Sequence, residues 1–194
     1  MKLLHLDSSI LGPVSASREL TAAVVEHLKE SRTDLEITYR DLAADPLPHL
    51  TLDIFNALES NEDLFQFLAT DIVVIGAGFY NFSIPSQLKA WLDRLAVRGT
   101  TFGYGETGPV GLVTGKRVIA VVTSGNVYGE GSPFRAYEHG RSLLHSMFSF
   151  IGVTDLEIIA AEGLSRGEDE RRAAMAGALA QIRSLSRVAA GKDA

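Results

Sequence analysis

The sequence has 194 residues, contains no cysteine and carries a net charge of −6 at pH 7. Its content of 46% hydrophobic and 22% charged residues is typical of a globular protein, and we expect one domain covering residues 1–194. The lack of cysteine excludes disulfides, thiol nucleophiles and thiolate or iron–sulfur centres, so redox chemistry would require an organic cofactor. The acidic balance argues against nucleic acid or an anionic membrane as a partner.

Five apolar runs that favour strands alternate with five amphipathic patterns that favour helices. In chain order we predict strand Leu3–Leu6, helix Ser17–Lys29, strand Leu35–Tyr39, helix Asn61–Leu68, strand Asp71–Ala77, helix Pro85–Arg98, strand Arg117–Thr123, helix Phe134–Phe150, strand Asp155–Ala160 and helix Asp169–Val188. This alternation predicts an α/β fold with a parallel sheet and right-handed crossovers. No apolar run reaches the length of a membrane span, and Asp7 comes too early for a secretion signal, so we expect a cytoplasmic protein.

Parallel sheets bind ligands beyond the carboxyl ends of their strands, which makes the loops after the first, third and fourth predicted strands candidates. The first loop, "DSSILGPVSAS", leads into a helix that Ser15 or Ser17 could cap. A single cap needs only one hydroxyl, whereas this loop has several. The alternative to a solvated, capped loop is a phosphate site at the helix N-terminus, with donors from Ser8, Ser9, Ser15 and Ser17.

The second and third loops have unusual compositions for connections. "GFYNFSIPS" places Phe79, Tyr80 and Phe82 around Asn81, either as one wall for a flat ring or as a turn whose aromatics complete the core. "TSGNVYGEGSP" is rich in glycine and hydroxyls, which suits either close approach to a ligand or an ordinary mobile loop. Three such loops at one sheet edge favour a ligand site.

Several other patterns do not indicate a site. "GYGETG" matches the dinucleotide pattern G-x-G-x-x-G, but it precedes Pro109 rather than a helix, so we predict a surface hairpin or loop. Ser8 or Ser9 as a nucleophile would need a histidine base and a third group, which the sequence does not supply. His5 lies within a strand and is interpreted as a satisfied core residue. The histidines and carboxylates show no metal-ligand spacing.

Five segments together resemble the FMN-dependent NADH-azoreductase and NADH:quinone oxidoreductase family, in order along essentially the whole chain. They are "DSSIL" with its following S-x-S, "RDLAADPLP", "YNFSIPSQLKAWLD", "TFGYGETGPVGLVTGK" and "FIGVTD". The resemblance implies a flavodoxin-like three-layer fold with strand order 2-1-3-4-5 and noncovalent FMN at a homodimer interface. It also implies that NADH or NADPH gives a hydride to the flavin and that a quinone or azo compound then takes two electrons, in a ping-pong cycle.

The resemblance assigns residues to each part of the site. The phosphate would be held by Ser9, Ser15, Ala16 and Ser17; the ring would be lined by Phe79, Tyr80, Asn81 and Phe82 and bordered by Thr123, Ser124, Gly125 and Asn126; Tyr104 and Phe150 would surround the substrate. The family commonly has Ser-Arg-Gly-Gly where this chain has Thr123 to Asn126, and methionine where it has Phe79. A flavodoxin-type electron carrier that does not itself oxidise NADH is the alternative, and a scaffold that has lost FMN is a third.

Overall fold

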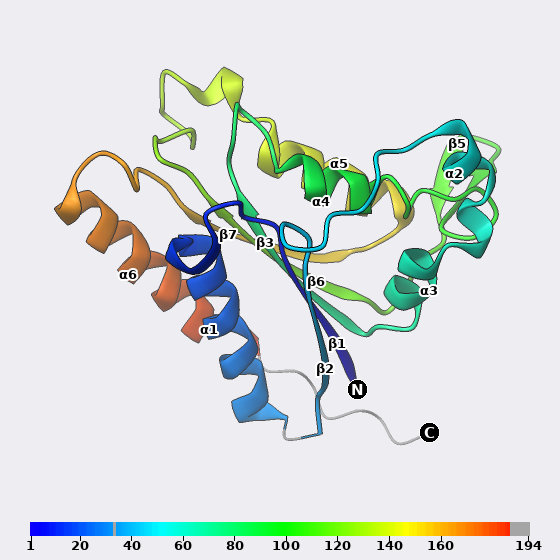
Figure 1. The fold of residues 1–194 in the computed structure, drawn as a ribbon, viewed down its shortest axis with the longest axis horizontal. Helices are drawn as coiled ribbons and strands as arrows, with labels where there is room; N and C mark the ends of the chain where they lie inside the picture. Colours follow the sequence, from blue (N-terminus) through cyan, green and yellow to red (C-terminus); the bar gives the residue numbers. More distant parts are fainter. Residues whose placement is uncertain (33, 187–194) are drawn as a thin grey trace.

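A five-stranded sheet runs through the centre of the molecule, a computed structural model that describes residues 1–32 and 34–186 (Figure 1). Its strands, all parallel, are β1 (Lys2–Asp7), β2 (Glu36–Asp41), β3 (Ile72–Gly78), β6 (Arg117–Thr123) and β7 (Asp155–Ala161). Their order, β2-β1-β3-β6-β7, is the order 2-1-3-4-5 that we predicted. The flavodoxin-like α/β fold is therefore confirmed.

Helices cover both faces of the sheet (Figure 1). α1 (Ala16–Ser31) and α6 (Glu168–Ser184) pack on one face, around Leu3, Val74 and Ile119. α4 (Ser86–Leu92) and α5 (Gly140–Ile151) pack on the other, around Leu4, Val73 and Trp91. Neighbouring strand residues enter opposite cores because side chains alternate across a strand. Burial on both faces explains why every residue of β3 and β6 is buried.

The predicted helix Phe134–Phe150 is wrong at its start. The chain makes a 3₁₀ turn, η3 (Arg135–Tyr137), and α5 begins only at Gly140. The Glu138 carboxylate accepts hydrogen bonds from the backbone N–H groups of Gly140 and Arg141, at 3.0 and 2.7 Å. A side chain that caps free N–H groups fixes a helix start, so the apolar periodicity before Glu138 does not continue the helix.

Two other predicted helices extend too far. α4 ends at Leu92 rather than Arg98, and the buried Thr101 hydroxyl, which donates to the Leu95 carbonyl at 2.5 Å, holds the turn that follows. α6 ends at Ser184, whereas the prediction ran to Val188, which lies outside the described residues. α3 (Glu62–Leu68) agrees with its prediction, and the Asn61 side chain caps it by accepting from the Asp63 N–H at 2.9 Å.

The sequence did not predict two short elements between β2 and β3, α2 (Leu52–Asn56) and η2 (Leu58–Ser60). It did anticipate the hairpin at "GYGETG", which forms β4 (Phe102–Gly105) and β5 (Gly108–Gly111). The hairpin packs closely against the end of α5, where a Cβ added to Gly111 would lie 2.2 Å from the Gly152 nitrogen. None of the helices in the described part of the chain is long and apolar enough to span a membrane.

Candidate active site

A pocket of about 310 Å³ opens at the carboxyl edge of the sheet, where the loops after β1, β3, β6 and β7 meet. The predicted residues that line it are Ser9, Ser15, Ala16, Phe79, Tyr80, Thr123, Ser124 and Gly125. Leu11, Val14, Gly78, Leu164, Ser165 and Arg171 complete the lining. The three candidate loops therefore share one cavity, and its volume is within the range of small-molecule sites.

The loop after β1 delivers the N-terminus of α1 to this pocket. η1 (Gly12–Val14) turns the chain, and Ser15 takes the N-cap position with extended backbone. Its hydroxyl makes no capping hydrogen bond and instead lies 3.0 Å from the Ser17 hydroxyl, with both serines buried. Ser15 therefore occupies the predicted N-cap position, but its hydroxyl makes no hydrogen bond to the helix backbone. An uncapped N-terminus leaves N–H groups and the positive end of the helix dipole available to an anion.

Arg18, which the sequence analysis did not single out, holds the loop after β1 in place by hydrogen bonds. Its guanidinium donates two hydrogen bonds to the Asp41 carboxylate, at 2.7 and 2.8 Å, and one to the Ser9 carbonyl at 3.0 Å. Hydrogen bonding by Arg18 holds the pKa of Asp41 below its ordinary value, and Asp41 raises the pKa of Arg18. Asp41 at the end of β2 thereby positions Ser9 at the end of β1.

Beneath this pair, the interior of the site is polar. Asp7 is buried and accepts hydrogen bonds from the hydroxyls of Thr21 and Tyr39, at 2.9 and 3.2 Å. His5 is buried as predicted; its Nε2 makes no hydrogen bond among the described residues but lies 3.6 Å from the Asp7 carboxylate, and its ring packs 5.0 Å from that of Tyr39.

The loop after β3 joins the loop after β1 through side chains. Phe79 and Tyr80 both line the pocket, and the Tyr80 hydroxyl lies 2.8 Å from the Ser9 hydroxyl. A Cβ added to Gly78 would lie 2.7 Å from the Tyr80 ring, so glycine at this position lets the tyrosine fold back over the strand end. The aromatic loop therefore supplies a wall of the pocket.

Asn81 and Phe82 follow in an unusual conformation. Their φ angles are +47° and +74°, and reciprocal backbone hydrogen bonds of 2.9 and 3.0 Å link Tyr80 and Ser83. Two successive positive φ angles define a type I′ turn, in which a bulky aromatic residue is strained. Both residues are exposed and lie outside the lining of the pocket, and the Phe82 ring packs 5.2 Å from that of Tyr137.

The loops after β6 and β7 form one wall because their backbones pair. The N–H groups of Gly163, Leu164 and Ser165 donate to carbonyls of Asn126, Ser124 and Gly125, at 2.9 to 3.1 Å. A Cβ on Gly125 would lie 2.7 Å from the Ser165 hydroxyl, so glycine lets the two loops approach without displacing this side chain. The loop after β7 was missed in the sequence, although a strand end followed by "EGLSRG" carries the same glycine and serine signal.

Tyr104 and Phe150 lie apart from the pocket lining. Tyr104 on β4 and Phe150 on α5 each contact Phe102, with ring centroids 5.8 and 4.7 Å away. Arg98 lies over the Tyr104 ring, 5.2 Å from its centroid. Tyr104 is 65% exposed and Phe150 36% exposed. With Phe102 they form an aromatic cluster that joins β4 of the hairpin to α5.

Comparisons with known proteins agree with this geometry. The sequence model of the flavodoxin-like fold family matches residues 1–185. An FMN-dependent NADH:quinone oxidoreductase from Methylorubrum populi is 49% identical, covering 92% of this chain and 96% of that protein. The chain belongs to this family. Among solved structures, an azoreductase from Bacillus anthracis is similar with a TM-score of 0.87 at 27% identity, covering 95% of this chain and 97% of that one.

A second family member allows the pocket to be tested for its cofactor. An FMN-dependent NADH-azoreductase from Bacillus anthracis, solved in complex with FMN, has a TM-score of 0.84 at 25% identity, covering 94% of this chain and 96% of that one. The donors here suit such a ligand, because buried serine hydroxyls and an uncapped helix N-terminus match a phosphate. The Phe79 and Tyr80 rings match a planar ring system. The residues present therefore fit FMN.

Proposed function

We propose that this chain is an FMN-dependent oxidoreductase that takes hydride from NADH and reduces quinones or azo compounds by two electrons in a ping-pong cycle. The main support for the proposal is that one pocket combines the uncapped N-terminus of α1 with an aromatic wall. The names of the family members, which are NADH:quinone oxidoreductases and azoreductases, support the same activity.

In this proposal Ser9, Ser15, Ala16 and Ser17 hold the phosphate, while Phe79 and Tyr80 lie against the ring. Bound FMN supplies hydride acceptance and two-electron transfer, so the protein needs no nucleophile of its own. Its groups bind and orient the two substrates in turn and exclude water from the ring. The backbone and hydroxyls of Thr123 and Ser124 border the ring from the opposite loop.

We further propose that the protein is a homodimer with the flavin at its interface, and that it acts in the cytoplasm, where NADH is available. Large apolar side chains that are exposed on the hairpin and its neighbours support the dimer, because such surfaces are usually covered by a partner. They are Leu52, Phe55, Tyr104, Val110, Leu112 and Phe150. A second copy would bring its cluster of Phe102, Tyr104 and Phe150 over the flavin, where the aromatics would hold a planar acceptor.

A flavodoxin-type carrier, which shares this fold, is the competing function. The purified chain should be mixed with FMN and desalted, and its visible spectrum recorded before and after anaerobic NADH and then a small quinone. We expect a retained flavin that NADH bleaches and the quinone restores. A retained flavin that NADH does not bleach would favour the carrier. Failure to retain flavin would refute both, and elution as a monomer in size-exclusion chromatography would refute the dimer.

A further inference from the structure

A second, larger pocket adjoins the candidate flavin pocket. It has a volume of about 540 Å³ and is lined by Asn126, Val127, Glu130, Gly131, Ser132, Pro133, Phe134 and Arg166. The two pockets are neighbours, because Gly125 and Ser165 line the first and the residues that follow each of them line the second. A molecule placed on the flavin could therefore extend directly into this space.

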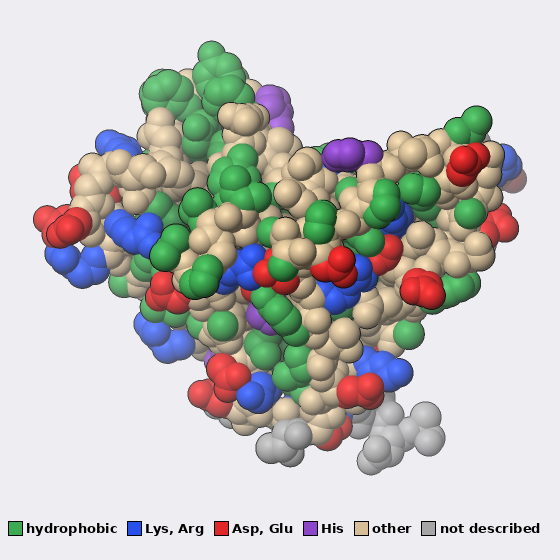
Figure 2. All heavy atoms as spheres, in the orientation of Figure 1, with side chains coloured by type: hydrophobic (Ala, Val, Ile, Leu, Met, Phe, Trp, Pro, Cys, Tyr) green, Lys and Arg blue, Asp and Glu red, His purple; other side chains and the backbone are tan. Residues whose placement is uncertain are grey.

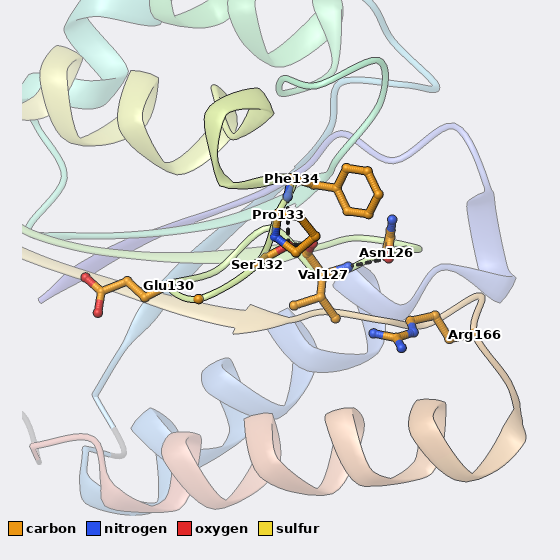
Figure 3. Close-up of a pocket in the computed structure, with 8 residues that line it drawn as sticks. Asn126, Val127, Glu130, Ser132, Pro133, Phe134 and Arg166 are labelled. Carbon is orange, nitrogen blue, oxygen red and sulfur yellow. Dashed lines mark hydrogen bonds between the residues drawn. The ribbon is translucent and has the colours of Figure 1, made fainter.

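The pocket presents hydrogen-bond donors on one side. The Asn126 side-chain oxygen accepts from the Val127 N–H at 2.9 Å, which leaves its amide nitrogen turned outward. Within the described residues, the Arg166 side chain makes no ion pair and no hydrogen bond. In Figure 3 the Asn126 and Arg166 side chains and the Phe134 ring lie on the same side, whereas the Glu130 carboxylate points the other way. The donors therefore lie on the side of the pocket opposite the one acidic group of its lining.

The loop that builds the pocket is held by its own hydrogen bonds. The Ser132 hydroxyl donates to the Val127 carbonyl at 2.7 Å and accepts from the Phe134 N–H at 3.1 Å. The Glu162 carboxylate accepts from the N–H groups of Tyr128 and Gly129, at 2.9 and 3.1 Å. The pocket is thus formed before a ligand arrives, which lowers the entropy lost on binding.

An aromatic face lies beside the donors. Phe134 is 43% exposed, and its ring is 6.4 Å from that of Tyr128, which in turn is 4.6 Å from that of Phe79 in the first pocket. Hydrophobic side chains cover the upper-left projection in Figure 2, where Figure 1 places the segment before α5. A flat heterocycle can stack on an exposed ring of this kind.

We propose that this second pocket binds the adenosine diphosphate half of the nicotinamide dinucleotide. Arg166 and the Asn126 amide donate to the pyrophosphate, and the Phe134 ring stacks on the adenine. An arginine matches phosphate oxygens in geometry and charge, and an acidic chain needs such a local cation to hold a dianion. This inference rests on the proposed function, because it assumes that the nicotinamide reaches the flavin.

The test compares NADH with reduced nicotinamide mononucleotide, which lacks the adenylate half. In anaerobic rapid mixing, the FMN-loaded protein should be half-saturated at a much lower concentration of NADH than of the mononucleotide. Arg166→Ala should raise the KM for NADH roughly tenfold, with kcat and the mononucleotide reaction unchanged. Arg166→Lys should recover part of the loss, and Phe134→Ala should weaken NADH more than Phe134→Tyr. Arg172→Ala, an exposed arginine of α6 outside both pockets, is the matched control.

Calorimetric titration with ADP gives an independent measurement. ADP should bind the wild-type protein and Arg172→Ala equally, and Arg166→Ala about tenfold more weakly. Wild-type protein that does not bind ADP, or an Arg166→Ala variant that keeps the full difference between NADH and the mononucleotide, would overturn the inference. If neither nucleotide reduces the flavin, the proposed function fails, and the ADP titration still decides whether this pocket binds the adenylate group.

Discussion

The Ser9 hydroxyl and the Tyr80 hydroxyl lie 2.8 Å apart, so a hydrogen bond joins the candidate phosphate loop to the candidate ring wall. Tyr80→Phe removes this link and keeps the ring. A hydrogen bond typically contributes about 1 kcal/mol, so the Kd for FMN should rise roughly fivefold in a fluorescence-quenching titration. Tyr137→Phe, an exposed tyrosine outside the pocket, serves as control. Equal affinity of Tyr80→Phe and wild type would show that the link does not organise the site.

The type I′ turn at Asn81 and Phe82 predicts a conflict between stability and activity. Phe82→Gly creates Asn-Gly, the preferred sequence for such a turn, and should raise the free energy of unfolding by about 1 kcal/mol in urea denaturation. The same change removes the Phe82 contacts with Tyr128 and Tyr137. Because Tyr128 packs on Phe79 of the pocket wall, this loss should lower quinone reductase activity. Lower stability would mean that the ring contacts of Phe82 outweigh its backbone strain.

The contact between Gly111 and Gly152 predicts a large destabilisation from one added methyl group. Gly111→Ala would place its Cβ 2.2 Å from the Gly152 nitrogen, so the hairpin must separate from α5. We expect a loss on the order of 3 kcal/mol in the free energy of unfolding. Gly177→Ala is the matched control: this helix position has nothing within 4 Å, so the change should stabilise by about 0.5–1 kcal/mol. Similar effects at both positions would contradict the packing argument.

The Arg18–Asp41 pair predicts a dependence of stability on acid. Arg18 lowers the pKa of Asp41 from its ordinary value of 3.8, so the carboxylate favours the folded state above pH 3.8. That contribution disappears as the pH falls through the lower folded pKa. Asp41→Asn should therefore lower the free energy of unfolding by about 1 kcal/mol at pH 7, and by progressively less below pH 3.8.

Denaturation of wild type and Asp41→Asn over this pH range measures the difference directly. Glu26→Gln is the control, because Glu26 pairs with Lys29 on the surface and such exposed pairs contribute little. A difference between wild type and Asp41→Asn that stays constant with pH would exclude titration of Asp41 as its cause.

The strands could be predicted because apolar β-branched runs such as "DIVVIGA" depend on burial alone, whereas their order was implied only by the family resemblance. The start of α5 could not, since it depends on the Glu138 carboxylate and not on the periodicity of the helix. The type I′ turn could not be predicted either, because neither Asn81 nor Phe82 is a glycine that would indicate a positive φ.

The candidate site was predictable in outline, since three loops at strand ends must meet at one edge of a parallel sheet. The position of Arg18 was not, because its role depends on the spacing between two strands and not on any local motif. The second pocket was missed because only the folded β7 loop brings Arg166 beside Asn126.

The candidate flavin pocket takes Ser9 from the start of the chain and Leu164, Ser165 and Arg171 from near its end. During synthesis, a nascent chain whose α6 segment has not yet emerged from the ribosome therefore has the hydroxyls for a phosphate but lacks one wall of the pocket. Under the proposed function, cofactor capture would follow completion of the polypeptide, and flavin colour would report folding of the whole sheet. A chain truncated before Leu164 would be colourless even with every N-terminal serine in place.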